Sequence, residues 1–347
     1  MNFSSLMPSR MVLLGMCALG TAASARADIT ATTAPYGVMA EAVPRGTRGL
    51  AFPLIASNLY LGRVEASAAG ILVLSSESLD PRGALVGSGP AYVEVLDGPW
   101  EGERLELDVA ATGAADGSSL VVLPANPRST RATLPPDGLA GARVAVRPHV
   151  TLAGVQAMLS PGLQGSNQAG KADAIHVFEN GRFERYYLRA DRTTWRRHGS
   201  NQDQRHLVIP PDVSVLLETR SGGRTWLHAG VVRNNAFRKN LTRGEQAFAS
   251  GFPLDLSPIA VGAFVDSETP ANYRWRGALL FPFADWFEQY GEGVPLLNRY
   301  FLQPNGRSWR RVLDLRDVAH APVLEATGMF VLRRNNPDPD YVIPVPF

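Results

Sequence analysis

The sequence predicts a mainly β fold, made of tandem β-sandwich-like or barrel-like modules with an internal duplication and a few short helices. The first observation is the distribution of glycine and proline. Gly (33) and Pro (26) together make up more than a sixth of the 347 residues, and they separate short runs rich in Val, Leu, Phe and Tyr. This pattern is typical of strands joined by tight turns. The second is a repeat. Arg185–Arg197 returns as Arg299–Arg311 without a gap, with six of thirteen positions identical, and such a repeat indicates architecture.

The repeated stretch predicts a β-hairpin in each copy. In the second copy Pro304-Asn305-Gly306 is an explicit turn, because proline fixes φ and Asn-Gly tolerates positive φ. Ala190-Asp191-Arg192 supplies the corresponding turn in the first copy. Since side chains alternate along a strand, the apolar side chains of each hairpin share one face. We expect Trp195 and Trp309 to close that face.

A short helix is predicted before each hairpin. In the first copy Thr151 is a suitable N-cap for a segment whose apolar residues lie on one side. In the second copy aromatic residues recur at i, i+3, i+4 and i+7 before Gly291. The residues that carry these patterns are Leu152, Val155 and Leu159 in the first copy and Phe283, Trp286, Phe287 and Tyr290 in the second.

Two further matches complete the predicted duplication. A strand follows each hairpin, and Val213–Leu217 matches Thr327–Val331 at the same offset of 114 residues. The polar loop Gly162–Asp173 is expected in the first copy only. Near the start of each copy, Arg45-Gly46 with Phe52-Pro53-Leu54 is echoed by Arg243-Gly244 with Phe252-Pro253-Leu254, once two residues are inserted.

These matches predict the order of modules along the chain. Clean alternation in residues 92–96, 104–109 and 119–123 predicts a small inserted β-barrel or sandwich between the two parts of the first copy. The predicted boundaries are 1–27 for a signal peptide, 28–79 for module A, 80–150 for the insert, 151–235 for module B, 236–283 for the repeat of A and 284–347 for the repeat of B.

The N-terminus predicts export. Arg10, an apolar run from Met11 to Leu19 and the small residues that end at Ala27 fit a secretory signal. Cys17, the single cysteine, lies inside it, so the chain from Asp28 has no thiol. We expect a secreted or periplasmic protein, and association with the cell surface stays open. No transmembrane helix is expected after the signal, because no later apolar run approaches about 20 residues.

Charge balance excludes one class of partner. Residues 1–27 contain two arginines and no acidic residue, so the remaining chain has 32 basic and 32 acidic side chains. Binding of nucleic acid needs a concentrated positive surface. Nucleic acid is therefore not an expected partner.

Several segments together resemble a known family. They are Thr32–Val38, Phe52–Leu54, Tyr92–Val95, Arg147–Leu152 and the Tyr-Tyr-Leu…Trp-Arg-Arg hairpin. The chain resembles the uncharacterised secreted β-rich proteins that are common in Verrucomicrobia and related bacteria. The resemblance implies export and a β-rich body. It implies no activity, cofactor or catalytic residue, because none is assigned to that family.

Motifs for nucleotide and metal chemistry are incomplete. Gly165–Ala172 matches a phosphate-binding loop except at its last position, where Ala172 replaces the hydroxyl that would hold Mg²⁺, and no strand precedes it. The six histidines show no metal-ligand spacing. Asp338 and Asp340 offer oxygen ligands, but Ca²⁺ needs roughly six to eight, so a turn is favoured there. No nucleotide, metal or cofactor is expected.

Two function classes stay open. The Trp-Arg-Arg motifs favour a binding role, because aromatic faces stack on sugars and guanidinium groups pair with carboxylate or sulfate. The alternative for these motifs is that the tryptophans fill the core while arginines lie along the sheet edge. The candidate binding residues are Trp195, Arg196, Arg197, Trp309, Arg310 and Arg311.

We therefore expect an exported, non-enzymatic structural or binding protein of the cell envelope, with a polysaccharide, surface polymer or envelope protein as its partner. The alternative is a carbohydrate-active hydrolase that uses paired carboxylates. Asp285 and Glu288 are the candidate pair on the second helix. A serine hydrolase is not expected, because the sequence contains no Gly-x-Ser-x-Gly elbow.

Overall fold

The computed structural model describes residues 35–68, 70–75, 85, 89–114, 118–131, 133–134, 138–291 and 298–346. The predicted fold class is confirmed, because the chain forms many strands in several sheets and its helices are short. The predicted signal peptide, with Cys17, and the predicted start at Asp28 lie outside the described residues. No helix in the described ranges is long and apolar enough to cross a bilayer.

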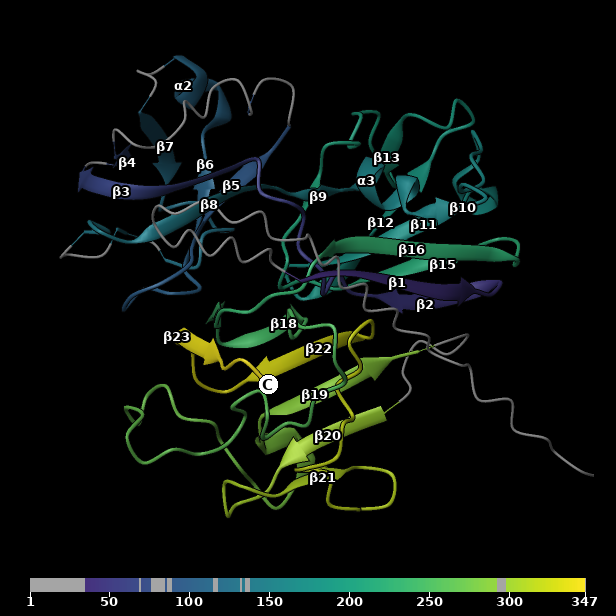
Figure 1. Cartoon of the computed structure of the whole chain (residues 1–347). Helices are drawn as coiled ribbons and strands as arrows, with labels where there is room; N and C mark the ends of the chain where they lie inside the picture. The colour runs from purple at the N-terminus through teal and green to yellow at the C-terminus, as the bar shows by residue number, and fades with distance from the viewer. Residues whose placement is uncertain are drawn as a thin grey trace, which may run out of the picture.

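Six strands close into a barrel in the order β3-β4-β7-β6-β5-β8, at the upper left of Figure 1. Apolar side chains such as Val64, Leu105 and Val144 fill it and are at most 1% exposed. Because β3 pairs with β8 and β4 pairs with β7, the barrel begins at Tyr60, which corrects the boundary expected at residue 80. The elements are β3 (Tyr60–Ala68), β4 (Ile71–Leu74), β5 (Ala91–Val95), β6 (Arg104–Leu107), α2 (Val109–Ala114), β7 (Ser119–Leu123) and β8 (Arg143–Pro148).

Two five-stranded sheets have the same strand order and form the duplicated body. The first sheet is β13 (Trp195–Arg197), β12 (Arg182–Leu188), β11 (Ala174–Glu179), β15 (Val215–Thr219) and β2 (Gly46–Leu50). The second is β21 (Trp309–Arg311), β20 (Asn298–Leu302), β19 (Trp286–Tyr290), β22 (Met329–Arg334) and β18 (Gly244–Phe248). Figure 1 shows the second sheet below the first. The echo between residues 45–54 and 243–254 therefore reflects equivalent strands.

The predicted hairpin is confirmed in both copies. Leu188 pairs with Trp195 in the first copy, and Leu302 pairs with Trp309 in the second. The registers are identical, since the tyrosine two residues before each leucine pairs with the last arginine of the motif. The thirteen-residue repeat is thus a repeat of structure.

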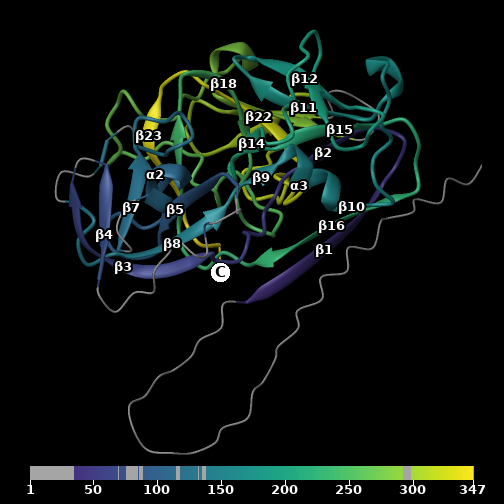
Figure 2. The same cartoon turned by 90° about the horizontal axis from the view of Figure 1, so that it is seen from above.

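Further strands cover one face of each sheet and enclose a core. In the first copy these are β1 (Tyr36–Val43), β16 (Arg224–Val231) and β10 (Leu159–Ser160), with β9 (Val150–Thr151), α3 (Leu152–Ala157) and β14 (Val208–Ile209) nearby. In the second copy they are β17 (Phe237–Leu241) and β23 (Asp338–Ile343). Figure 2 shows β1 and β16 side by side, as their pairing requires. Helix α3 was predicted, and Thr151 Oγ1 accepts a hydrogen bond from Gly154 N at 3.1 Å. The helix ends at Ala157, so Leu159, expected on its apolar side, begins strand β10 instead.

Strand pairing corrects one predicted alignment. Val215 pairs with Leu50, and Phe330 pairs with Phe248. Leu50 and Phe248 end equivalent strands, so Val215 corresponds to Phe330, 115 residues later. The expected offset of 114 was wrong by one residue. A slip of one residue moves every side chain to the other face of a sheet, whereas Val215 and Phe330 both belong to the core of their own copy.

The helix predicted around residues 283–290 is wrong. The structure has a single 3₁₀ turn, η2 (Phe281–Phe283), followed by strand β19, which pairs with β20 and β22. Both faces of this strand are buried: Trp286 lies in the apolar cluster between the two copies and Phe287 in the core of the second copy. A strand buried on both faces loses its alternation, so a helical spacing arose by coincidence.

The loop expected in the first copy only is present in both. Residues 164–173 include the 3₁₀ turn η1 (Ala169–Lys171), and residues 276–285 include η2 at the same place. A Cβ atom on Gly165 would lie 2.0 Å from Arg189 O, and one on Gly277 would lie 1.9 Å from Gln303 O. Both loops therefore run against the end of the hairpin, and each needs its glycine.

The two copies pack on each other through the outer faces of their sheets. Leu216, Trp286, Phe301, Met329 and Val331 form the apolar centre of this contact. Its backbone bonds are reciprocal, because Ala51 N donates to Thr327 O at 3.0 Å and Ala249 N donates to Asp212 O at 3.1 Å. These are equivalent positions in the two copies, so the contact resembles a two-fold interface within one chain.

Candidate binding cleft

A cleft of about 590 Å³ opens on the second copy, between β23 and the long segment that joins β18 to η2. Figure 1 shows β23 in yellow with the green loops of this segment beside it. Residues from the segment and from β23 line the cleft. They are Ile259, Gly262, Phe264, Asp266, Thr269, Pro270, Tyr273, Arg274, Trp275, Asp338, Asp340, Tyr341, Val342 and Pro344.

Trp275 forms part of the wall and is held from several sides. Its ring centroid lies 5.8 Å from that of Trp309 and 5.8 Å from that of Tyr341. The guanidinium carbon of Arg334 lies 3.9 Å from the ring centroid of Trp275, a cation–π arrangement. Since Trp275 is 6% exposed, only a small part of its ring borders the cleft, and the neighbouring side chains hold that ring in place.

Arg334 is fixed by a buried carboxylate. Its Nε lies 3.3 Å from Asp285 Oδ2, and both side chains have no exposed surface. Arg334 Nη2 also donates to Tyr273 O at 2.7 Å. The core pair thereby positions both the ring of Trp275 and the backbone of Tyr273.

The remaining lining segment is anchored by local hydrogen bonds. Tyr341 donates its hydroxyl to Val261 O. Arg274 donates to Thr269 O and to Ser267 O, each at 2.5 Å, which closes the turn that carries Asp266. The half-buried rings of Phe264 and Tyr273 are left facing the cleft.

Three carboxylates lie around the cleft. Burial raises the pKa of Asp338, while the charge of Arg334 and a hydrogen bond from Asp340 N oppose the rise. Asp340 is 53% exposed and pairs with Arg131 from the barrel. The third, Asp266, lies on the opposite segment. A half-buried acid of raised pKa in a cleft is a candidate functional group.

The chemistry of this cleft suits a polyhydroxylated ligand. Carboxylates accept hydrogen bonds from hydroxyl groups, and aromatic side chains contact the apolar faces of sugar rings. Among the described residues, no group of three or more His, Cys, Asp and Glu side chains is arranged to hold a metal ion. Asp338 and Asp340, considered above as oxygen ligands, instead follow one another along β23.

The six binding residues predicted from the hairpins are not brought together. Trp195 and Trp309 have no exposed surface and lie in different cores. Trp195 Nε1 donates to Gln156 Oε1 at 3.2 Å, and Trp309 Nε1 donates to Ala263 O at 2.6 Å. Neither ring has a face available to a sugar, so sugar stacking on these tryptophans is excluded by their burial.

The arginines of the motif lie on separate sheets and mostly have local partners. Arg196 donates to Asn201 at 3.0 Å, Arg197 pairs with Glu184 at 3.0 Å, and Arg311 pairs with Asp314. Arg310 is exposed. These contacts fit the edge-strand alternative given above.

The carboxylate pair considered for hydrolysis does not line this cleft. Asp285 is fully buried, and Glu288 lies on the neighbouring strand β19, where it pairs with Arg299 at 2.6 Å. Asp285 Oδ2 accepts from Arg276 N at 2.8 Å and Oδ1 accepts from Asn335 N at 2.7 Å. Asp285 thus supports the fold, and the acids of the cleft are different residues.

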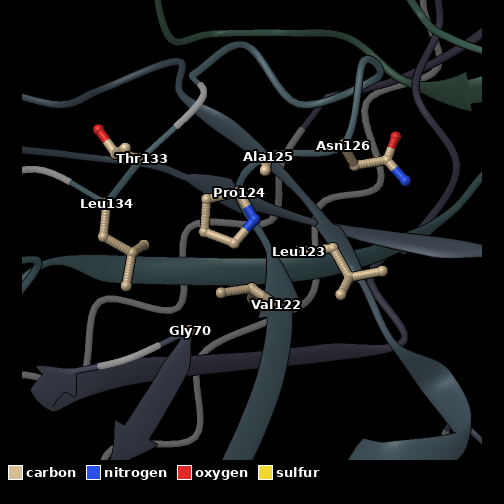
Figure 3. Close-up of a pocket in the computed structure, with 8 residues that line it drawn as sticks. All are labelled: Gly70, Val122, Leu123, Pro124, Ala125, Asn126, Thr133 and Leu134. Carbon is tan, nitrogen blue, oxygen red and sulfur yellow. The ribbon is translucent and has the colours of Figure 1, made fainter.

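A second hollow of about 670 Å³ lies on the barrel. Figure 3 shows Val122, Leu123, Pro124 and Leu134 around it, with Asn126 and Thr133 as its polar side chains. Its lining has no ionisable group. It therefore lacks the acid–base and charge features that distinguish the cleft on the second copy.

The sequence did contain a signal for the cleft. Leu256 bridges Leu324 as Val150 pairs with Ile209, and Arg276 N bonds to Asp285 as Gln164 N bonds to Asp173. Residues 255–276 therefore correspond to residues 149–164 of the first copy, with six residues added (22 against 16). This segment contains Tyr273-Arg274-Trp275 next to a polar turn. Aromatic residues in a segment that is longer in one copy were a better indicator of a site than those in the thirteen-residue repeat, because closely repeated residues serve the packing that the two copies share.

The chain matches no protein-family model, no curated protein and no solved structure.

Proposed function

We propose that this protein is an exported, non-enzymatic binding protein of the cell envelope and that it binds a carbohydrate in the cleft on its second copy. One observation carries the proposal: the half-buried rings of Phe264 and Tyr273, beside Trp275, line the same cleft as Asp266 and Asp338. Rings and carboxylates on one concave surface are the side chains that recognise the apolar faces and hydroxyl groups of sugars.

The charge of the cleft narrows the ligand class. Asp266 and Asp338 are joined by Asp340, whose charge Arg131 offsets, and Arg274 donates its side-chain hydrogen bonds to backbone carbonyls. Like charges are costly when brought together in a partly desolvated site. The proposed ligand is therefore a neutral or amino sugar. The acidic polysaccharide that the arginine pairs suggested is not proposed for this cleft.

Affinity electrophoresis against neutral, amino-substituted and acidic polysaccharides tests the proposal. We expect retardation by a neutral or amino polysaccharide, and Tyr273→Ala to weaken binding about 5- to 30-fold, because a lost ring contact is worth roughly 1–2 kcal/mol. Tyr36→Ala is the matched control, since Tyr36 is 50% exposed on β1 of the first copy. Absence of retardation by all three classes, or an equal effect of both variants, would refute it.

A hydrolase remains the second candidate, because burial raises the pKa of Asp338, as a general acid requires, and Asp266 lines the same cleft. Incubation of the bound polysaccharide with the protein should then release new reducing ends, and Asp338→Asn should abolish that release while binding persists. Binding without release in the wild type leaves the non-enzymatic proposal standing and removes the hydrolase.

A further inference from the structure

The loops that contain η1 and η2 have the same fold and opposite chemistry. Lys171 N donates to Gln168 O and Ala172 N to Ala169 O; Phe283 N donates to Leu280 O and Ala284 N to Phe281 O. The backbone is thus repeated bond for bond. The five residues are Asn-Gln-Ala-Gly-Lys at 167–171 in the first copy and Leu-Leu-Phe-Pro-Phe at 279–283 in the second.

The apolar version of this loop is largely in contact with solvent. Leu279 is 79% exposed, Leu280 is 63% exposed and Phe283 is 59% exposed. Because the polar loop of the first copy folds identically, the fold does not require these apolar side chains. Large apolar groups gathered on an exposed surface mark an interaction site.

Phe281 attaches the loop to the second sheet. Its ring centroid lies 5.4 Å from that of Trp286 and 6.1 Å from that of Phe301. The guanidinium carbon of Arg299 lies 5.4 Å from the Phe281 ring centroid. Phe281 therefore holds the loop against the sheet, while Leu279, Leu280 and Phe283 remain outside the core. We call residues 279–283 the apolar loop.

Arginines surround the base of the apolar loop. Arg276 is exposed just before it, and Arg310 is exposed on β21, paired in register with Phe301 and so on the face that Phe281 covers. Within the described residues, neither side chain has a carboxylate partner. Arg299 pairs with Glu288 but remains 42% exposed.

We propose that the apolar loop docks this protein onto an anionic lipid surface, with Leu279, Leu280 and Phe283 inserted at the boundary between headgroups and acyl chains. Exposed apolar side chains above a cationic base are the features of a peripheral membrane anchor. A second copy of the chain fits less well. A two-fold contact through this loop would bring the unpaired arginines of both subunits together.

Vesicle co-sedimentation of the purified protein tests the proposal. We expect binding to vesicles of phosphatidylglycerol and phosphatidylcholine, and weaker binding to phosphatidylcholine alone. The triple variant Leu279→Asn, Leu280→Gln, Phe283→Gln, which takes two of its residues from the first-copy loop, should lower the partition coefficient at least about 30-fold. Arg276→Gln with Arg310→Gln should lower it roughly fivefold or more on anionic vesicles.

Leu227→Asn is the matched control, because Leu227 is 45% exposed on β16 of the first copy, and we expect it to bind vesicles like the wild type. Thermal unfolding should show that all variants remain folded, since the substituted residues are exposed. The proposal is overturned if the wild type does not bind anionic vesicles or if the triple variant binds equally well. It is also overturned if sedimentation shows a dimer that the triple variant dissociates, with no vesicle binding. None of these outcomes depends on sugar binding in the cleft.

Discussion

Asp173 and Asp285 occupy equivalent positions in the two copies, and each accepts hydrogen bonds from two backbone N–H groups and pairs with a buried arginine. Each is fully buried and precedes the central strand of its sheet. Asp173 accepts from Gln164 N and from Arg220 N, each at 2.6 Å, as Asp285 does from Arg276 N and Asn335 N at 2.8 and 2.7 Å. An arginine completes each set: Arg224 lies 2.8 Å from Asp173 and Arg334 lies 3.3 Å from Asp285.

We expect Asp173→Asn and Asp285→Asn each to lower the free energy of unfolding by about 2–4 kcal/mol, because each leaves a buried arginine without its counter-charge and turns an amide donor toward backbone N–H groups. Urea denaturation measures the effect. Asp314→Asn removes an exposed carboxylate and should leave the unfolding midpoint unchanged. Equal urea midpoints for the wild type and all three variants would show that the buried carboxylates do not stabilise the fold.

These two aspartates also show what the sequence could and could not predict. The hairpin repeat was found because its tryptophan and leucine positions fill the same core sites and its arginine positions have the same register in both copies. The Gly…Ala-Asp pattern of residues 165–173 and 277–285 is equally regular, but it was hidden because the loop between is polar in one copy and apolar in the other. Charge and exposure in that loop are free to diverge, since they are not set by the fold.

The cleft was harder to predict for a different reason. Trp275 lies near Tyr341 in space, and Asp266 joins Asp338 across the cleft, yet each pair is separated by more than sixty residues of chain. Side chains that meet only through tertiary contacts form no local sequence motif, so their proximity cannot be predicted from their spacing along the chain. The strand β19 was mistaken for a helix on similar grounds, because its burial on both faces depends on the other copy.

Glu94 should make the protein sensitive to acid. Burial alone would raise the pKa of Glu94, but Arg233 and Arg147 outweigh it and lower the pKa from 4.5 to about 2. A carboxylate with a lowered pKa stabilises the fold fully above pH 4.5, and that contribution is lost as the pH falls from 4.5 through 2, because the unfolded chain takes up the proton first.

We expect the free energy of unfolding to fall by about 3 kcal/mol over this range from Glu94 alone. Glu94→Gln should be less stable at pH 7, because Arg233 and Arg147 lose their partner, and should depend less on pH below 4.5. Denaturation at a series of pH values measures both. A variant that keeps the full acid dependence would assign it to other carboxylates.

His228 should act in a higher pH range. It is 3% exposed and stacks on Trp226 with ring centroids 5.3 Å apart. Burial lowers the pKa of His228 from 6.5 to about 4, although a hydrogen bond from Nε2 to Leu54 O opposes the shift. Between these values the unfolded state binds the proton and the folded state does not, so stability declines as the pH falls from 6.5 to 4.

The contribution of His228 over that range is about 3 kcal/mol. His228→Gln should therefore reduce the slope of unfolding free energy against pH between 6.5 and 4 by up to one proton, while the slope below 4 stays the same. An NMR titration that finds the His228 ring protonated near pH 6.5 in the folded protein would contradict this expectation.

Gly49 should report on the contact between the copies. It lies on β2, and a Cβ atom there would be 2.5 Å from Met329 N and 2.6 Å from Met329 Cβ on the other copy. Backbone cannot move aside as a flexible side chain does, so we expect Gly49→Ala to lower the free energy of unfolding by about 1–3 kcal/mol. Gly170→Ala is the control, because nothing lies within 4 Å of a Cβ atom at that position, and its unfolding free energy should change by no more than about 0.5 kcal/mol. If the two alanine variants unfold at the same urea concentration, the copies are not as closely packed at β2 and β22 as these distances require.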